Sequence, residues 1–371
     1  MKITGIEAIV LNVPYEHGAP KPPMSSGGTR TTMDAIAVKV DTDEGLTGWG
    51  EAFGFATIPV TVSAIEQVIG PAAIGLDAAD ITGTTIQLKR RFQNMMHGGP
   101  ARFAVSALDI ALWDIAGQAA GVPVCQLLRR AMSDNRPVPA SLTAYASLFR
   151  LPTPADVGRI CEEAAGRGYR HVKLHEKTPE AVAAARAALG PDLALMVDVN
   201  CAFDEPGAIA FARAIAPHAP DWLEEPLFPT DDYEALARIR AGGGVPLSIG
   251  ENLGNPNDVK RLGEHKAVNV VQPSVVKIGG ISDVVRVFAI GREAGLRVVP
   301  HAPFIGPGLT ATVHLVAALA EDEWVEHRYC DLEASPFGPS ILAENGRLPV
   351  PEGPGLGLAP DPALIARYRV N

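Results

Sequence analysis

Polar side chains recur at a regular interval through the second half of the 371-residue chain. Neighbouring members of this series lie 23 to 27 residues apart, and each follows a short apolar stretch. The series consists of Lys173, Asp198, Glu224, Glu251, Ser274, His301 and Glu326. An interval of this length holds one strand and one helix, so the pattern predicts that equivalent ends of successive strands carry the chemistry of the protein.

Three members of the series are carboxylates on consecutive predicted strands, namely Asp198, Glu224 and Glu251. Unpaired carboxylates inside a barrel are costly, so the pattern predicts a bound cation. Three oxygen ligands favour a hard divalent ion, and we expect Mg²⁺. The alternative is that each is an independent, solvated acid at a strand end. The register at this point of the chain is open by one residue; with Glu224 as the ligand, Glu225 points the other way, into the helical layer.

Basic and acidic side chains flank the three carboxylates. Lys173 and His175 are two residues apart, so they share one face of their strand. His301 and Glu326 follow on later strands. A lysine on an inward-facing strand is costly unless it meets an anion. We therefore predict that these four residues are catalytic, the alternative for either histidine being a satisfied core side chain.

The second half of the chain alternates short apolar stretches with Ala-rich helical ones. The strand candidates are Ala140–Ser147, His171–His175, Leu193–Asn200, Trp222–Pro226, Pro246–Asn252, Val268–Ser274, Arg297–His301 and Trp324–His327. Eight strands alternating with helices predict an α/β fold, a closed (β/α)8 TIM-type barrel. Such barrels place their active sites at the carboxyl ends of the strands, where the polar series lies.

The first part of the chain has a different pattern. An extended apolar run over Lys2–Val13 precedes a predicted hairpin formed by Ala35–Val40 and Leu46–Phe53, and helical periodicity follows up to Ala120. This predicts an α+β domain with three strands. We expect three units: residues 1–125 as the α+β domain, 126–345 as the barrel, and 346–371 as a Pro/Gly-rich tail that packs back on the first domain.

A long polar loop, His17–Thr32, separates the first strand from the hairpin. Loops of this length in compact domains are usually functional, so we expect it to set specificity. His17, Lys21 and Arg30 are its candidates for binding a distal carboxylate or hydroxyl groups of a substrate. The alternative is a solvated loop.

The composition excludes several classes of partner. The chain has 32 Lys and Arg against 42 Asp and Glu, a net charge of −10 without a basic cluster. Nucleic acid and anionic membranes are therefore poor partners. No apolar run reaches the length of about 18 residues that spans a bilayer. The N-terminus is typical of a strand rather than a signal peptide, and four scattered cysteines are typical of free thiols, so we expect a cytoplasmic protein.

The motifs along the chain resemble those of one family. They are Ala107-Leu-Asp-Ile-Ala-Leu-Trp-Asp-Ile-Ala-Gly117, Gly121-Val-Pro123, Val172-Lys-Leu-His175, Asp198-Val-Asn200, Leu223-Glu-Glu-Pro226, Ile249-Gly-Glu-Asn252, Lys277-Ile-Gly-Gly280, Pro300-His301 and Trp324-Val-Glu326. With these motifs the chain resembles the enolase superfamily, in its mandelate racemase/muconate lactonizing enzyme group, over essentially its whole length. The motifs are specific for fold and metal site and much less specific for substrate.

The resemblance implies an N-terminal capping domain that closes over a Mg²⁺-binding barrel. It also implies abstraction of a proton α to a carboxylate, which gives an enediolate, and hence a small-molecule carboxylate as substrate. This superfamily uses a Lys or His base together with Mg²⁺. Symmetric homo-oligomers are common in the family, so we expect one here.

Two departures from the family pattern concern the acid and the base. Ser274 stands where muconate-type members have a lysine and racemase-type members have the aspartate that orients the catalytic histidine. The second strand has Lys-x-His rather than Lys-x-Lys, so His175 takes a base or acid position. His301 and Glu326 resemble the racemase-type base and the hydrogen-bond donor to the enediolate. Asn200 matches a substrate-contacting position of the family. Ser274 is a further candidate for binding the substrate.

The leading functional prediction is a Mg²⁺-dependent lyase that dehydrates a hydroxy acid, with a sugar acid as substrate. One histidine would abstract the α proton and the other would protonate the departing β-hydroxyl. The alternative is an isomerase, a racemase or epimerase in which the histidines act on opposite faces of one carbon. A third reading, from another class, is a non-catalytic barrel that binds a ligand.

Overall fold

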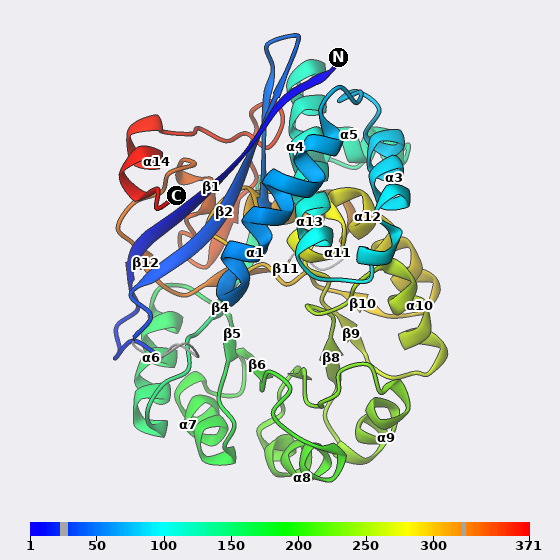
Figure 1. Cartoon of the computed structure of the whole chain (residues 1–371). Coiled ribbons are helices and arrows are strands. Elements are labelled where there is room, and N and C mark those ends of the chain that lie inside the picture. Colours follow the sequence, from blue (N-terminus) through cyan, green and yellow to red (C-terminus); the bar gives the residue numbers. More distant parts are fainter. Residues whose placement is uncertain (23–28, 321–323) are drawn as a thin grey trace.

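The computed structural model describes residues 1–22, 29–320 and 324–371. An N-terminal α+β part lies over a barrel of parallel strands surrounded by helices (Figure 1). This confirms the predicted fold class. The boundaries predicted for the three units stay a prediction.

The N-terminal part is built on an antiparallel sheet with the strand order β12-β1-β2-β3. Its strands are β1 (Ile3–Glu16), β2 (Thr32–Thr42), β3 (Thr47–Ala52) and β12 (Asp331–Leu332). The predicted hairpin is present as β2 and β3, with Gly45 at a positive φ of 81° in its turn. The first part of the chain supplies the three predicted strands, β1 to β3, and a fourth, β12, joins their sheet from the far end of the chain. Two residues are too few to show strand alternation in a sequence.

Helix α4 (Pro100–Ala120) packs directly on β3, and glycines make this approach possible. A Cβ atom on Gly48 would lie 2.2 Å from the carbonyl oxygen of Ala111, and one on Gly50 would lie 1.9 Å from that of Ala107. No side chain fits at such distances, so β3 must carry glycine on this face. The other helices of this part are α1 (Ile58–Ser63), α2 (Gly70–Ala73), α3 (Ile81–Arg91) and α5 (Val124–Ala131).

Helix α4 also qualifies one sequence expectation. By length and composition it could cross a membrane, and it is the one such helix among the described residues. However, 67% of its most apolar window is buried inside the protein, which is the behaviour of a core helix. The apolar character of α4 therefore reflects its place between the sheet and the barrel.

Eight parallel strands form the barrel, in the hydrogen-bonded order β10-β9-β8-β7-β6-β5-β4-β11. They are β4 (Ser141–Ser147), β5 (His171–Leu174), β6 (Ala194–Asp198), β7 (Trp222–Glu224), β8 (Leu247–Ile249), β9 (Val270–Val271), β10 (Arg297–Val298) and β11 (Trp324–Arg328). A further strand, β13 (Arg347–Pro349), pairs antiparallel with β4. The strands are short, so each ends close to the barrel mouth and delivers its last side chains there.

Helices follow the strands around the outside of the barrel. They are α6 (Pro154–Gly166), α7 (Pro179–Leu189), α8 (Glu205–Ile215), α9 (Tyr233–Gly243), α10 (Pro256–Glu264), α11 (Val275–Ile278), α12 (Gly280–Glu293) and α13 (Pro307–Leu319). Several begin at a side chain that caps the first backbone N–H groups, namely Thr153, Asp204, Asp232 and Asn255. Such caps fix where each helix starts and therefore the length of the loop that leaves the strand.

Buried polar contacts join the N-terminal part to the barrel. Arg102 of α4 donates to the carbonyl oxygen of Ile278 and pairs with Asp283 of α12. On β3, Glu51 is buried, and its carboxylate accepts a hydrogen bond of 2.8 Å from the backbone N–H of Gly308, in the first turn of α13. Both contacts fix the N-terminal sheet above the barrel mouth.

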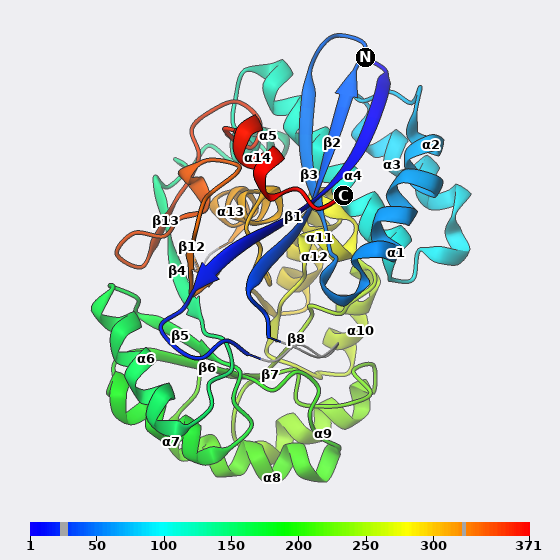
Figure 2. The ribbon, with the colours of Figure 1, turned by 60° about the vertical axis from the view of Figure 1, so that its left-hand side comes forward.

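The end of the chain returns to the N-terminal sheet. After α14 (Pro362–Tyr368), the backbone N–H of Val370 donates to the carbonyl oxygen of Val10, and the backbone N–H of Val10 donates to the side chain of Asn371. Figure 2 shows the C-terminus beside β1. The C-terminal residues thus pack on the middle of β1.

Candidate active site

Alternation along the barrel strands decides which side chains face the interior. Tyr145, Met196 and Trp222 belong to one buried cluster that fills the barrel. Asp198 and Glu224 stand two residues after Met196 and Trp222, so they face the same interior one layer closer to the mouth. The indole N–H of Trp222 donates to Oε2 of Glu224 at 3.1 Å. The apolar layer therefore forms a floor beneath the acids.

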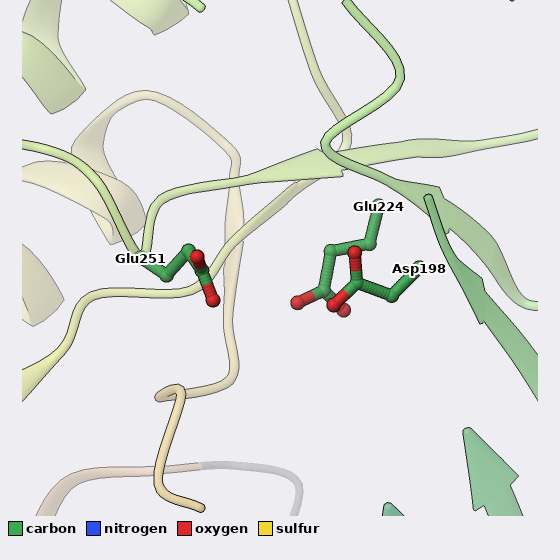
Figure 3. Close-up of side chains that lie close together, drawn as sticks. All are labelled: Asp198, Glu224 and Glu251. Atoms are coloured by element: carbon green, nitrogen blue, oxygen red, sulfur yellow. The ribbon is translucent and has the colours of Figure 1, made fainter. Parts of the chain in front are cut away.

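The three predicted ligands, Asp198, Glu224 and Glu251, lie together. One carboxylate oxygen of each falls within 4.8 Å of the others. Figure 3 shows Asp198 and Glu224 side by side, with Glu251 facing them from the loop after β8. Asp198 and Glu224 are buried, and the side chain of Glu251 is 18% exposed. An all-oxygen donor set of this size fits one hard divalent ion.

The geometry also decides between the two adjacent glutamates, because Glu224 and not Glu225 joins the cluster. Glu225 has a positive φ of 47°. Its carboxylate accepts hydrogen bonds from the backbone N–H of Gly250 at 3.2 Å and from the thiol of Cys201 at 3.1 Å. These partners are in loops after β6 and β8, so the expectation that Glu225 points into the helical layer was wrong. Cys201, which the sequence left without a role, is a hydrogen-bond donor to it.

Lys173 lies at the centre of the acidic side chains. Its Nζ is 3.0 Å from Oε1 of Glu224, 2.9 Å from Oε1 of Glu326 and 3.6 Å from Oδ2 of Asp198. The lysine is fully buried. Burial alone would lower its pKa, but the surrounding carboxylates outweigh burial and raise it well above the usual value. Lys173 is therefore a fixed positive charge.

One lysine does not neutralise the acids around it. Burial, together with the charges of Asp198, Glu326 and Glu251, raises the pKa of Glu224 well above its usual value despite Lys173. Burial also acts to raise the pKa of Glu251, but His301 and Lys277 outweigh it and hold that pKa well below the usual range. Crowding of carboxylates thus disfavours the ionised form of Glu224 even beside Lys173, and a divalent ion would relieve this repulsion.

His175 flanks the cluster on the side of Asp198. Its Nε2 lies 3.4 Å from Oδ2 of Asp198, and its Nδ1 lies 2.5 Å from the carbonyl oxygen of Leu148. A carbonyl oxygen can only accept, so Nδ1 carries a proton and Nε2 is the atom that faces the site. Burial lowers the pKa of His175, although Asp198 opposes this.

His301 flanks the opposite end of the cluster. Its Nε2 lies 2.7 Å from Oε2 of Glu251. Its Nδ1 is buried and has no hydrogen-bond partner among the described residues. Ser274 is bridged to His301 through the backbone, yet its hydroxyl is also buried and without a described partner. In this arrangement Ser274 does not orient the imidazole.

Glu326 lies on β11 with both carboxylate oxygens engaged. Oε2 accepts a hydrogen bond of 2.9 Å from the backbone N–H of Ala302, and Oε1 pairs with Lys173. Burial would raise the pKa of Glu326, but Lys173, His301 and Arg328 hold it below the usual range. An ionised Glu326 accepts hydrogen bonds, whereas the resemblance implied a donor.

The other substrate-binding candidates are placed differently from one another. Asn200 is exposed at the mouth, and its backbone N–H donates to Asp198 at 2.8 Å. Lys21 pairs with the exposed Glu16 at 2.8 Å. His17 is buried against Phe149, with ring centroids 4.9 Å apart. Nε of Arg30 donates to the carbonyl oxygen of Thr32 at 3.3 Å. Residues 23–28 of that loop lie outside the described residues.

Sequence reasoning missed two cations near the cluster. Lys277 lies 3.9 Å from Glu251, with its Nζ 4.1 Å from the ring centroid of Phe53, which follows β3 of the N-terminal part. Arg328 stands two residues after Glu326 on β11. Alternation along a strand places residues i and i+2 on one face, as it does for Lys173 and His175. The same argument would have predicted that Arg328 shares a face with Glu326.

Two family models match the chain. Residues 6–129 match the mandelate racemase/muconate lactonizing enzyme N-terminal domain, and residues 156–364 match the enolase C-terminal domain-like model. Together they cover both the N-terminal part and the barrel.

Curated relatives match over most of their length. The chain is 28% identical to a D-galactarolactone cycloisomerase of Agrobacterium fabrum, covering 100% of this chain and 99% of the relative. It is 30% identical to a D-galactonate dehydratase of Ralstonia pickettii, covering 88% of this chain and 89% of the relative.

Among solved structures, the 3,6-anhydro-D-galactonate cycloisomerase of Zobellia galactanivorans superposes with a TM-score of 0.86 at 28% identity, and all of both chains is covered. The names of these relatives are those of enzymes, which sets aside a non-catalytic barrel. The protein belongs to the enolase superfamily, in its mandelate racemase/muconate lactonizing enzyme group, and is a lyase or isomerase of that group.

Proposed function

We propose that the protein catalyses Mg²⁺-dependent abstraction of a proton α to a carboxylate and, through the resulting enediolate, dehydrates a hydroxy acid of the sugar-acid class. The observation that carries this proposal is the buried carboxylate cluster with one histidine at each end. The distances of 3.4 Å from His175 to Asp198 and 2.7 Å from His301 to Glu251 define the two ends. The names of the dehydratase and cycloisomerase relatives support sugar acids as substrates.

Asp198, Glu224 and Glu251 would hold the ion, since their oxygens converge and their crowding disfavours the ionised form of Glu224. When bound, the ion would supply Lewis-acid stabilisation to the carboxylate oxygens of the substrate, where charge accumulates as the α proton leaves. Lys173 adds a permanent positive charge beside them. Its engagement with Glu326 also fixes its position before the substrate arrives.

The two histidines carry the proton transfers in this proposal. Leu148 holds the proton of His175 on Nδ1, which leaves the Nε2 lone pair toward the site as an acceptor. We therefore assign His175 as the base that takes the α proton. His301, at the other end of the cluster, is then the acid that protonates the departing β-hydroxyl. Ser274 and Asn200, near these ends, stay candidates for contacting the substrate.

A racemase or epimerase is the second candidate, and one observation favours it. The histidines approach the cluster from strands on opposite sides of the three ligands, which would place them on opposite faces of one carbon. An isomerase needs no departing hydroxyl, so the same residues could serve both reactions. The homo-oligomer and the cytoplasmic location expected from the sequence stay predictions.

Incubation of the Mg²⁺-loaded enzyme with a library of hydroxy acids in D2O tests the proposal. Dehydration gives a keto acid, whereas racemisation returns substrate labelled at the α carbon. His175→Asn should lose both turnover and α-proton exchange, because exchange needs only the base. His301→Asn should lose net turnover and keep exchange. His265→Asn, on the exposed end of α10, is the matched control and should behave as wild type. Exchange that survives in His175→Asn would move the base elsewhere.

A further inference from the structure

Arg328 forms no ion pair with the described residues, although it lies beside the catalytic cluster. It ends β11, two residues after Glu326, and therefore faces the same side of the strand. The Nε atom of Arg328 is buried and has no hydrogen-bond partner among the described residues. Its guanidinium carbon lies 5.0 Å from the ring centroid of Phe149. A buried guanidinium N–H without an acceptor is costly, so its retention needs an explanation.

A second arginine reaches the same place from the polar loop of the N-terminal part. Nε of Arg30 donates to the carbonyl oxygen of Thr32 at 3.3 Å, and its guanidinium lies 4.9 Å from the ring centroid of Phe55. Burial first, and then the positive charge of Arg328, lower the pKa of Arg30, with Asp34 opposing them. Tyr15 links the two arginines geometrically: its hydroxyl donates to the backbone oxygen of Arg30, and its ring stacks on Phe149, over which Arg328 lies.

Aromatic side chains pack against this arginine pair. Tyr15 stacks on Phe149 with ring centroids 4.8 Å apart, and His17 packs against the same ring. The hydroxyl of Tyr15 donates to the backbone oxygen of Arg30 at 3.0 Å. Burial raises the pKa of Tyr15 to about 12, so its hydroxyl stays neutral. Glu16, which follows Tyr15 on β1, is exposed and paired with Lys21.

The arginine pair adjoins the cluster without belonging to it. Burial acts to raise the pKa of Glu326, whereas the charges of Lys173, His301 and Arg328, in decreasing order, lower it. Burial is the main cause of the lowered pKa of His175, and the charge of Arg328 lowers that pKa further. The mouth of the barrel therefore has an acidic end, suited to a cation, and a basic end, suited to an anion.

We propose that Arg328, with Arg30, forms a subsite for a second carboxylate of the substrate, so that the enzyme acts on dicarboxylic sugar acids. This inference rests on the proposed function, in which the first carboxylate lies at the acidic cluster. The planar guanidinium matches a carboxylate with two parallel hydrogen bonds. A guanidinium also pairs with a phosphate, so a terminal phosphate ester is the necessary comparison in the test.

The experiment compares three substrates of the same configuration. The first is a six-carbon aldaric acid, with a carboxylate at each end. The second is the aldonic acid, which has a terminal hydroxymethyl group, and the third is the phosphate ester of that hydroxymethyl group. The loss of a buried charge contact typically costs about 30-fold or more in affinity. The Mg²⁺-loaded wild-type enzyme should therefore favour the diacid by about 30-fold or more in kcat/KM. Arg328→Met should remove that preference mainly through KM, and Arg328→Lys should restore part of it, because it returns the charge without the fork.

Two further variants complete the design. Arg30→Met should reduce the same preference, by less than Arg328→Met, because Arg30 lies on the loop rather than on a barrel strand. Arg238→Met is the matched control, since this arginine pairs with Glu205 on the outside of the barrel and should leave both substrates unaffected. Circular dichroism and thermal melting establish that each variant is folded.

Calorimetric binding of glutarate and butyrate to the Mg²⁺-loaded protein separates this proposal from the proposed function. Wild type should bind glutarate more tightly, and Arg328→Met should not. Equal binding of both acids by wild type, unchanged glutarate binding by Arg328→Met, or a preference for the aldonate or the phosphate ester overturns the subsite, even if α-proton exchange proceeds. Absence of exchange with every acid, with glutarate binding intact, overturns the function and leaves the subsite standing.

Discussion

The two ends of the barrel mouth treat charge in opposite ways. At the acidic end, Lys173 lies within 3.6 Å of three carboxylates, and their crowding still disfavours the ionised form of Glu224. At the basic end, Arg328 and Arg30 lie over aromatic rings, and neither forms an ion pair with the described residues. Each end is incomplete by itself. A substrate with two charged groups, together with a divalent ion, would neutralise both, which is why this contrast bears on substrate choice.

The largest expected effect comes from breaking the acidic end at Glu224. Glu224→Gln keeps the shape of the side chain and removes one ligand charge. We expect kcat to fall at least about 10³-fold and Mg²⁺ to bind more weakly, because the ion stabilises the charge that develops in the transition state. Steady-state kinetics and metal analysis check this. Glu264→Gln, at an exposed site on α10, is the control. Near-normal turnover and metal content in Glu224→Gln would mean that the ligands are misassigned.

Removing the central cation tests how the acidic end is held together. Lys173→Met leaves Asp198, Glu224 and Glu326 facing one another in the metal-free protein. Loss of one partner from a buried ionic network typically costs about 3–5 kcal/mol, so we expect a fall of that order in the free energy of unfolding. Mg²⁺ should recover part of it, while turnover stays low. Denaturant unfolding with and without Mg²⁺ measures both effects, with Lys260→Met on the exposed face of α10 as the control. Stability within about 1 kcal/mol of wild type without metal would contradict the network.

Glu51 is a buried acid for which the structure describes no neighbouring cation, unlike the carboxylates that surround Lys173. Burial raises its pKa to about 7, although the hydrogen bond from Gly308 opposes this. The folded state therefore binds the proton more tightly than the unfolded state does. Stability from this group is fully present below pH 4.5 and falls as the pH rises toward 7, by about 3 kcal/mol.

Glu51→Gln cannot ionise and should not show this loss. The free energy of unfolding of the variant minus that of wild type should rise by about 3 kcal/mol between pH 4.5 and pH 8. Denaturant unfolding across this range measures the difference, and effects from other groups cancel between the two proteins. A pH-independent difference would show that folding does not raise the pKa of Glu51.

The smallest expected effect concerns Ser274. Ser274→Asp puts a carboxylate on the residue whose backbone is bridged to that of His301, the histidine with the unpartnered Nδ1. A neighbouring carboxylate raises the basicity of an imidazole, so the limb of the pH–rate profile that reports His301 should move up by about one pH unit. Ser274→Ala is the control and should leave the profile in place. An unmoved profile in Ser274→Asp would show that proton transfer by His301 does not limit the rate.

The sequence predicts features that depend on residues close together in the chain better than features that depend on contacts between distant segments. The metal ligands Asp198 and Glu224 could be found because strand alternation and a repeat of one strand and one helix are local, periodic properties. Strand β12 was missed because two residues carry no such period. The hydrogen bonds of Glu225 depend on a positive φ and on two other loops, which no pattern in the chain reveals.

The sequence by itself determined the barrel, the capping sheet, the family and the identity of the carboxylate cluster, because each rests on residue type and spacing. Only the tertiary structure decided how charge is distributed across the mouth. Whether Arg328 is paired depends on which side chains the N-terminal loop and the barrel bring together, and these come from positions some 300 residues apart, such as Arg30 and Arg328. Electrostatic energy depends on distance in space and on burial, and a linear sequence specifies neither directly.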